Sequence, residues 1–238
     1  MQYSTFAAID IGSYDVILEI FEISKKQGIR SVDKICHRME LGKDTYTLGK
    51  IRPEMEEELC RVLADFVRIM EGYRVDAYRA MASSAISEAA NSLYVLGKIR
   101  QLTGLSVTVL SNSEQRFLGY KALAAMEDNF NKVIEKGTAI LDLDGGSFQI
   151  SLFDKDALVT TQNIRMGSLR VRERLAGIQS ETEHYEEMVE ELIWNEVSSF
   201  KKMYLKDRKI ENIMLIGDVF TDSVYQNIEE KTTKNHFP

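Results

Sequence analysis

Residues 139–151 read AILDLDGGSFQIS, an apolar run followed by an acidic residue, two glycines and a serine before a second run begins. The same plan stands near the start of the chain, where residues 6–20 read FAAIDIGSYDVILEI. A turn rich in glycine and serine presents several backbone N–H groups in one direction, and such a nest binds anionic oxygens. Each stretch taken alone is more often a plain hairpin. Their occurrence at equivalent places in two halves favours a phosphate-binding interpretation.

Each glycine turn opens a similar succession of expected elements, so the chain divides into two α/β halves. The first half is predicted to contain strands in 5–23, 29–41, 76–82 and 107–111, with helices in 53–73, 87–104 and 113–127. The second half is predicted to contain strands in 138–154, 156–167 and 212–217, with a helix in 181–205. We expect a first domain at 1–127, a linker at 128–137 and a second domain at 138–238. Two such halves suggest two lobes that face one cleft, where α/β proteins commonly bind ligands.

The composition excludes several classes of protein. The chain has 238 residues, a formal net charge of −7 and 44% hydrophobic residues, which argues against general binding to DNA or RNA because such proteins neutralise phosphates with basic residues. No apolar run approaches the roughly 20 residues that cross a membrane, and no signal peptide is expected. The two cysteines, Cys36 and Cys60, lack metal-binding spacing. These features predict a soluble, cytoplasmic protein with no DNA or membrane partner.

Six stretches carry a resemblance to a known family. They are AAIDIGSYDVILEI, LGKDTYTLGKIRPE, ASSAISEAANS, VTVLSNSEQRFLGYKAL, AILDLDGGSFQIS and IRMGSLRVRERL. They follow one another in family order over nearly all of residues 6–217, and the chain resembles the Ppx/GppA family of exopolyphosphatases and guanosine pentaphosphate phosphohydrolases. The resemblance implies an α/β, two-lobed actin-like ATPase (acetate kinase/hsp70/actin, ribonuclease H-like) fold with the second lobe shortened at its C-terminus.

The resemblance also implies a reaction, in which water attacks the terminal phosphorus of polyphosphate or of a guanosine polyphosphate nucleotide with the help of Mg²⁺. Positioning and charge stabilisation supply most of such catalysis. A homodimer is a further expectation from the family. The implied metal-binding residues are Asp10 and Asp142, and Asp142 is also a catalytic candidate beside Gln115 and Glu114. The implied phosphate-binding residues are Gly12, Ser13, Ser87, Gly145, Gly146 and Ser147.

The chain departs from the family pattern at polar positions that the chemistry uses. Ser87 stands in place of a phosphate-binding arginine, and a hydroxyl cannot supply a charged fork. Gln115 stands in place of the glutamate that activates water. The loss of such a general base lowers the reaction rate by a factor of about 10²–10⁴. Glu114 could replace it only with distortion, since neighbouring helical residues point about 100° apart. Further departures are Tyr14, Asp144, Gln149 and the turn 217–221.

Three interpretations follow from these departures. The first is a hydrolase of phosphoanhydrides with weakened or altered catalysis. The second is a non-catalytic relative that binds polyphosphate, a nucleotide or a protein partner, and the third is a structural module of a larger polypeptide.

Three other features have weaker interpretations. A basic segment could face a polyanion or only solvent, and the histidines lack ligand spacing. Trp194 shares the apolar spacing of its helix and is expected in the core. The residues of the basic segment are Arg165, Arg170, Arg172 and Arg174, and the histidines are His37, His184 and His236.

Overall fold

The computed structural model describes residues 3–126, 129–179, 184–206 and 208–217. The chain divides into two compact units, residues 1–120 and 121–238. The domain limits expected at 127 and 138, and the linker role of 128–137, stay predictions; within that stretch a short helix, α6 (Phe130–Ile134), buries its two end residues. Among the described residues, none of the helices combines the length and the apolar character needed to cross a membrane.

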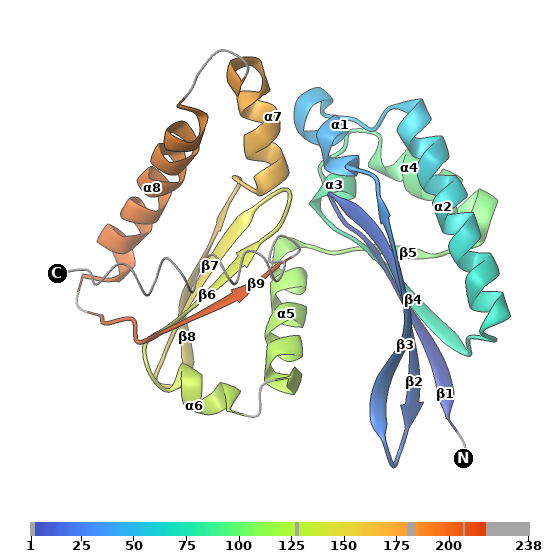
Figure 1. Cartoon of the computed structure of the whole chain (residues 1–238), viewed down its shortest axis with the longest axis horizontal. Helices are drawn as coiled ribbons and strands as arrows, with labels where there is room; N and C mark the ends of the chain where they lie inside the picture. Colours follow the sequence, from blue (N-terminus) through green and yellow to red (C-terminus); the bar gives the residue numbers. More distant parts are fainter. Residues whose placement is uncertain (1–2, 127–128, 180–183, 207, 218–238) are drawn as a thin grey trace. The chain divides into compact units, whose positions relative to one another are not determined.

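The first unit is a five-stranded sheet with the order β3-β2-β1-β4-β5. Strand β1 runs antiparallel to β2 and parallel to β4, so the predicted hairpin around the first glycine turn is confirmed. Figure 1 shows α2 and α4 together along this sheet. The elements are β1 (Ser4–Ile11), β2 (Asp15–Ser24), β3 (Gly28–Arg38), α1 (Leu41–Leu48), α2 (Pro53–Gly72), β4 (Ala77–Ala82), α3 (Ser84–Ser87), α4 (Ser92–Thr103), β5 (Val107–Val109) and α5 (Asn112–Met126).

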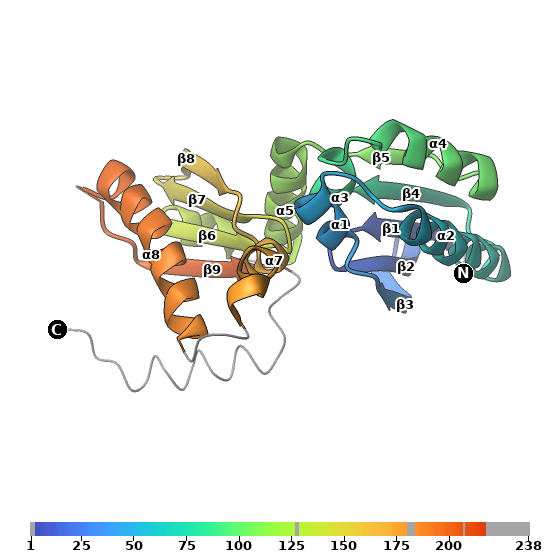
Figure 2. The same cartoon turned by 90° about the horizontal axis from the view of Figure 1, so that it is seen from above.

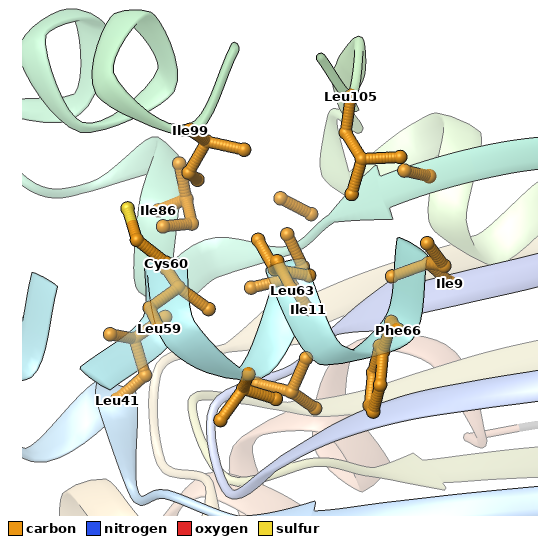
Figure 3. Packing of buried hydrophobic residues seen from close by; sticks show 14 of the residues in the cluster. Ile9, Ile11, Leu41, Leu59, Cys60, Leu63, Phe66, Ile86, Ile99 and Leu105 are labelled. Atoms are coloured by element: carbon orange, nitrogen blue, oxygen red, sulfur yellow. The ribbon is translucent and has the colours of Figure 1, made fainter. Parts of the chain in front are cut away.

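The core of the first unit lies between this sheet and its helices. Alternate residues of β1 point into it, as the two-residue period of a strand requires. Figure 3 shows the packing of Ile9 and Ile11 with side chains from α2, among them Leu63 and Phe66. Phe6 and Ala8, on the other face of β1, are only half-buried. The continuous apolar run of residues 6–9 is typical of a strand buried on both faces, but here only one face of β1 is fully buried.

The second unit repeats this plan in a four-stranded sheet with the order β8-β7-β6-β9. Strand β6 runs antiparallel to β7 and parallel to β9, which confirms the second predicted hairpin. Figure 2 shows α7 and α8 from above, and α8 packs Phe200 against β7 and β8. The elements after α6 are β6 (Thr138–Leu143), β7 (Phe148–Asp154), β8 (Ala157–Ile164), α7 (Ser168–Gln179), α8 (Tyr185–Tyr204) and β9 (Asn212–Ile216).

Helix α8 buries less of its apolar surface than its sequence predicts. Phe200 is the only residue of this helix whose side chain is buried. Trp194 is 59% exposed and lies under Lys201, whose Nζ is 5.5 Å from the ring centroid. The expectation that Trp194 is a core residue is therefore wrong, because the helix turns that side chain away from the sheet that Phe200 contacts.

Candidate functional site

The first glycine turn, residues 10–15, is fixed by the segment that leads into α1. Inside the turn, the Gly12 amide donates to the Asp15 carbonyl at 3.0 Å. The Ser13 carbonyl accepts from the Gly42 amide at 2.9 Å, and the Tyr14 carbonyl accepts from the Met39 amide at the same distance. The start of α1 is thereby joined to the backbone of the turn, so the two segments form one rigid feature of the first unit.

A chain of hydroxyl groups connects this turn to α1 and α3. Ser13 Oγ lies 2.6 Å from Tyr46 Oη, which lies 2.8 Å from Ser84 Oγ at the start of α3. The neighbouring Thr45 hydroxyl donates to the Ala85 carbonyl at 2.7 Å. Ser13, a predicted phosphate-binding residue, is only 6% exposed. Its hydroxyl is thus engaged by Tyr46, a residue that the sequence analysis did not single out.

The other two predicted site residues of this region are exposed. Asp10 lies near the end of β1, in register with Ile17 of β2 and Met81 of β4. Ser87 ends the short helix α3, where its amide donates to the Ser83 carbonyl at 3.1 Å. Both positions belong to the first unit, as predicted, and both are open to solvent.

Glu114 caps its own helix. Its Oε2 accepts from the Ser111 amide at 2.8 Å and from the Ser111 hydroxyl at 2.7 Å, while the Glu114 amide donates back to Ser111 Oγ at 3.3 Å. This reciprocal pair is a capping box. The hydrogen bonds from the Ser111 amide and then from its hydroxyl lower the pKa of Glu114. A carboxylate stabilised in this way is a weak proton acceptor, which counts against Glu114 as a substitute base.

A hollow of about 260 Å³ lies beside Glu114 on the first unit. Arg79 of β4 lines it together with Phe117 of α5, and both side chains are exposed. Arg79 pairs with Ala8 in the β1–β4 ladder, two residues from the Asp10–Met81 pair. This arginine is a cation that the motif comparison missed, because it lies inside a strand rather than in a recognised motif.

The second glycine turn, residues 144–147, is held by backbone contacts. The Asp144 amide donates to the Ser147 carbonyl at 3.0 Å, and the Asp144 carbonyl accepts from the Ser168 amide at 3.1 Å. Gly167, just before α7, presses on the turn: a Cβ there would stand 2.3 Å from the Ser147 nitrogen and 2.4 Å from the Asp144 oxygen. Only glycine allows this approach, so α7 begins directly against the turn.

The turn keeps two backbone donors at its centre. Gly145 and Gly146 are buried, and within the described part of the chain their amides donate to no protein acceptor. Buried backbone N–H groups are nearly always paired with protein, water or ligand. The predicted phosphate-binding pair therefore offers two unsatisfied backbone donors, which is what an anion-binding turn needs. Ser147, the third predicted residue, is 8% exposed beside them.

Asp142 begins a row of polar side chains across the second sheet. It pairs with Gln149 of β7, which pairs with Asn163 of β8, so all three lie on one face. Gln149 is 2% exposed, and its Oε1 and the Asn163 Oδ1 are buried with no hydrogen-bond partner among the residues that the structure describes. In the described residues, no three His, Cys, Asp or Glu side chains gather closely enough to hold a metal. The row supplies carboxylate and amide oxygens instead.

The basic segment around the start of α7 is partly structural. Arg170 Nε donates to the Gly146 carbonyl at 2.9 Å, while the Arg170 amide donates to the Gly145 carbonyl at 3.0 Å. Arg172 pairs with Glu173 at 2.9 Å, and Arg165 and Arg174 are exposed. Arg170 thus braces the turn and adds positive charge beside it, while the question of whether this segment faces a polyanion or only solvent stays open.

The remaining sequence predictions are either scattered or beyond the described residues. His37 lies 3.4 Å from Glu58 and His184 lies 2.8 Å from Glu187. Residues 218–221 of the late turn, and His236, lie outside the described residues. The two glycine turns belong to different units. That they face one cleft stays a prediction.

The sequence of this chain is similar to those of several known proteins. The chain is 21% identical to a bifunctional 3-dehydroquinate synthase/phosphatase of Fusobacterium nucleatum over 94% of its own length and 34% of that protein. It is 25% identical to exopolyphosphatase 1 of Mycobacterium leprae over 60% of its length and 41% of that protein. The chain therefore spans about a third to two fifths of these curated relatives.

The solved structure of the Ppx/GppA family member of Aquifex aeolicus has a TM-score of 0.69 and 22% identity, over 95% of this chain and 71% of that one. Likenesses of this kind confirm the predicted actin-like α/β fold class. The model of the Ppx/GppA phosphatase family matches residues 19–236. The chain belongs to the Ppx/GppA phosphatase family.

Proposed function

We propose that this protein binds polyphosphate or a guanosine polyphosphate nucleotide at its second glycine turn and hydrolyses the terminal phosphoanhydride bond with weakened catalysis. The observation that carries the proposal is the second turn, where the buried amides of Gly145 and Gly146 are left without a protein acceptor among the described residues. An anionic oxygen satisfies such donors, and the nearby Arg170 adds positive charge.

The weakened catalysis rests on two neighbouring residues of α5. Gln115 is a carboxamide, which cannot accept a proton at neutral pH. Glu114 has its carboxylate engaged by Ser111, and the resulting lower pKa makes it a poorer base. A missing general base reduces the rate by about 10²–10⁴, so slow turnover is the expected outcome.

The polar row in the second sheet fits a magnesium ion. Mg²⁺ binds oxygen ligands, usually through one or two carboxylates, with water and phosphate oxygens completing its shell. Asp142 would supply the carboxylate, and the unpartnered Gln149 Oε1 and Asn163 Oδ1 would add amide oxygens. When bound, the ion would neutralise charge on the phosphate, while the turn's amides orient the chain end.

A second candidate function is binding without turnover. The engagement of Glu114 in its capping box favours it, since neither residue at the expected position of the base then serves as one. In this case the same turn would recognise polyphosphate, a nucleotide or a protein partner. Both candidates require an anion at the second turn, and they differ only in the release of phosphate.

The test is phosphate release from long-chain polyphosphate with Mg²⁺, compared between the natural chain and the double variant Gln115→Glu/Ser87→Arg. The variant restores the base and the cationic contact, and we expect a gain of about 10²-fold or more. The matched control is Gln101→Glu/Ser106→Arg, which makes the same charge changes at exposed positions on α4 and before β5.

The outcomes separate the candidates. Slow release by the natural chain and a gain in the variant but not in the control supports weakened catalysis. Binding of polyphosphate without release of phosphate, in the natural chain and in the double variant alike, would favour the non-catalytic relative. Full release by the natural chain would overturn the weakened-catalysis proposal, and failure of every variant to bind would overturn both candidates.

A further inference from the structure

The Ser13–Tyr46–Ser84 hydroxyl chain has no role in the function proposed above. It joins the first glycine turn, α1 and α3, with oxygen–oxygen distances of 2.6 and 2.8 Å. Such distances are those of good O–H···O hydrogen bonds. A phosphate oxygen bound by Ser13 would stand at the same distance from Oγ. The Tyr46 oxygen thus lies at a hydrogen-bonding position that a phosphate oxygen would need.

The surroundings hold the Tyr46 hydroxyl in that position. Helix α1 is joined to the turn through the Gly42 amide and the Ser13 carbonyl, and to α3 through the Thr45 hydroxyl and the Ala85 carbonyl. Asp44, which is 1% exposed, pairs with Arg52 at 2.8 Å and joins the helix to the segment that follows it. With α1 fixed by these contacts, Tyr46 has little freedom to leave Ser13.

We infer that Tyr46 is a specificity-determining residue of the first turn, whose hydroxyl takes the place of a phosphate oxygen and excludes the ligand from Ser13. This inference rests on the proposed function, because it concerns the same ligand class. It makes the two turns unequal: the second turn binds the phosphate chain, while the first admits it only when Tyr46 moves. The class of ligand excluded is the terminal phosphoryl group of an inorganic polyphosphate.

The chemistry explains why a tyrosine can do this. The phenol hydroxyl can donate one hydrogen bond and accept others. It can therefore bond the hydroxyls of both Ser13 and Ser84, as the oxygens of a phosphate group would. Unlike phosphate, it is neutral and tethered, so it binds the two serines without a charge to neutralise. A phosphate must therefore displace two existing hydrogen bonds before it gains any contact with Ser13.

The experiment compares Tyr46→Phe with the natural chain by isothermal titration with inorganic tripolyphosphate at fixed ionic strength. Phenylalanine keeps the ring and removes the oxygen, so we expect about tenfold tighter binding. Tyr94→Phe on α4, where the side chain is 65% exposed, is the matched control and should change nothing. Ser84→Ala removes one anchor of the Tyr46 hydroxyl and should tighten binding by a smaller factor.

A purely structural role predicts the opposite result. Loss of a stabilising hydroxyl would lower the melting temperature of Tyr46→Phe and leave its affinity equal to or weaker than that of the natural chain, which would overturn the inference. Should the natural chain bind tripolyphosphate with no gain in either variant, the inference fails and the proposed function stands. If neither the natural chain nor Tyr46→Phe nor Gln115→Glu/Ser87→Arg binds, both fail.

Discussion

The two glycine turns have similar sequences and are held in different ways. The first is fixed partly by side chains, since the Tyr46 hydroxyl bonds the Ser13 hydroxyl and reaches Ser84. The second is fixed mainly by backbone, through the Ser168 amide and the close approach of Gly167, with one side-chain contact from Arg170 Nε to the Gly146 carbonyl. A shared motif therefore identifies a shared shape, while the contacts around each turn decide which donors remain for a ligand.

The largest expected effect concerns the backbone contact of the second turn. In Gly167→Ala the new Cβ would meet backbone atoms of Asp144, Gly145 and Ser147 at 2.3–2.4 Å, so we expect a loss of about 3 kcal/mol or more in the free energy of unfolding. Urea denaturation measures it. The control is Gly97→Ala in α4, where a Cβ meets nothing within 4 Å and should stabilise by roughly 0.5–1 kcal/mol. An unchanged stability of Gly167→Ala would show that the turn can shift.

A smaller effect is expected at the support of the first turn. Asp44 is buried, and its carboxylate accepts from the Arg52 amide at 2.9 Å and pairs with the Arg52 guanidinium. Asp44→Asn leaves a weaker acceptor and removes the ion pair, which should cost about 1–3 kcal/mol. Asp65→Asn, at an exposed pair on α2, is the comparison and should cost much less. Equal losses in the two variants would contradict a special role for α1.

The smallest effect concerns the capping box of α5. Hydrogen bonds from Ser111 lower the pKa of Glu114, so its contribution to stability is present above the pKa of the unfolded chain and is lost as pH falls through the folded pKa. Glu114→Ala should lower the melting temperature at pH 7, and the difference should fade in acid. The melting temperature of Glu114→Gln, whose side chain can still accept a hydrogen bond from Ser111, should lie between those of the natural chain and Glu114→Ala. A difference that persists at low pH would contradict the charged capping role.

Both hairpins and the long helices are predictable from local pattern, whereas α1 is not. Its eight residues include only two aliphatic side chains, Leu41 and Leu48. The helix begins after Glu40, a non-glycine residue with a φ of 51° and no side-chain cap. Its stability comes from contacts distant in sequence, such as the Thr45 hydroxyl with the Ala85 carbonyl. A local pattern carries no information about such partners.

In the candidate site, too, some features can be predicted from local sequence and others depend on contacts between distant residues. The glycine turns and the departure from the family pattern at Gln115 are readable from motifs. The start of α4 is not: it lies at Ser92 rather than near 87, because the Asn91 side chain binds both backbone groups of Ile51 at 2.8 and 3.0 Å. Tyr46 was missed for the same reason, since only the folded chain brings its hydroxyl to Ser13.

The backbone support of the second turn has a consequence for how this protein can change. A turn whose shape depends on the main chain and on Gly167 can exchange its surrounding side chains without losing its form. Asp144 and Gln149, which differ from the family pattern, lie within or beside such a turn. The main-chain shape of the turn therefore tolerates such substitutions, and its backbone donors keep their places whichever of these side chains surround them.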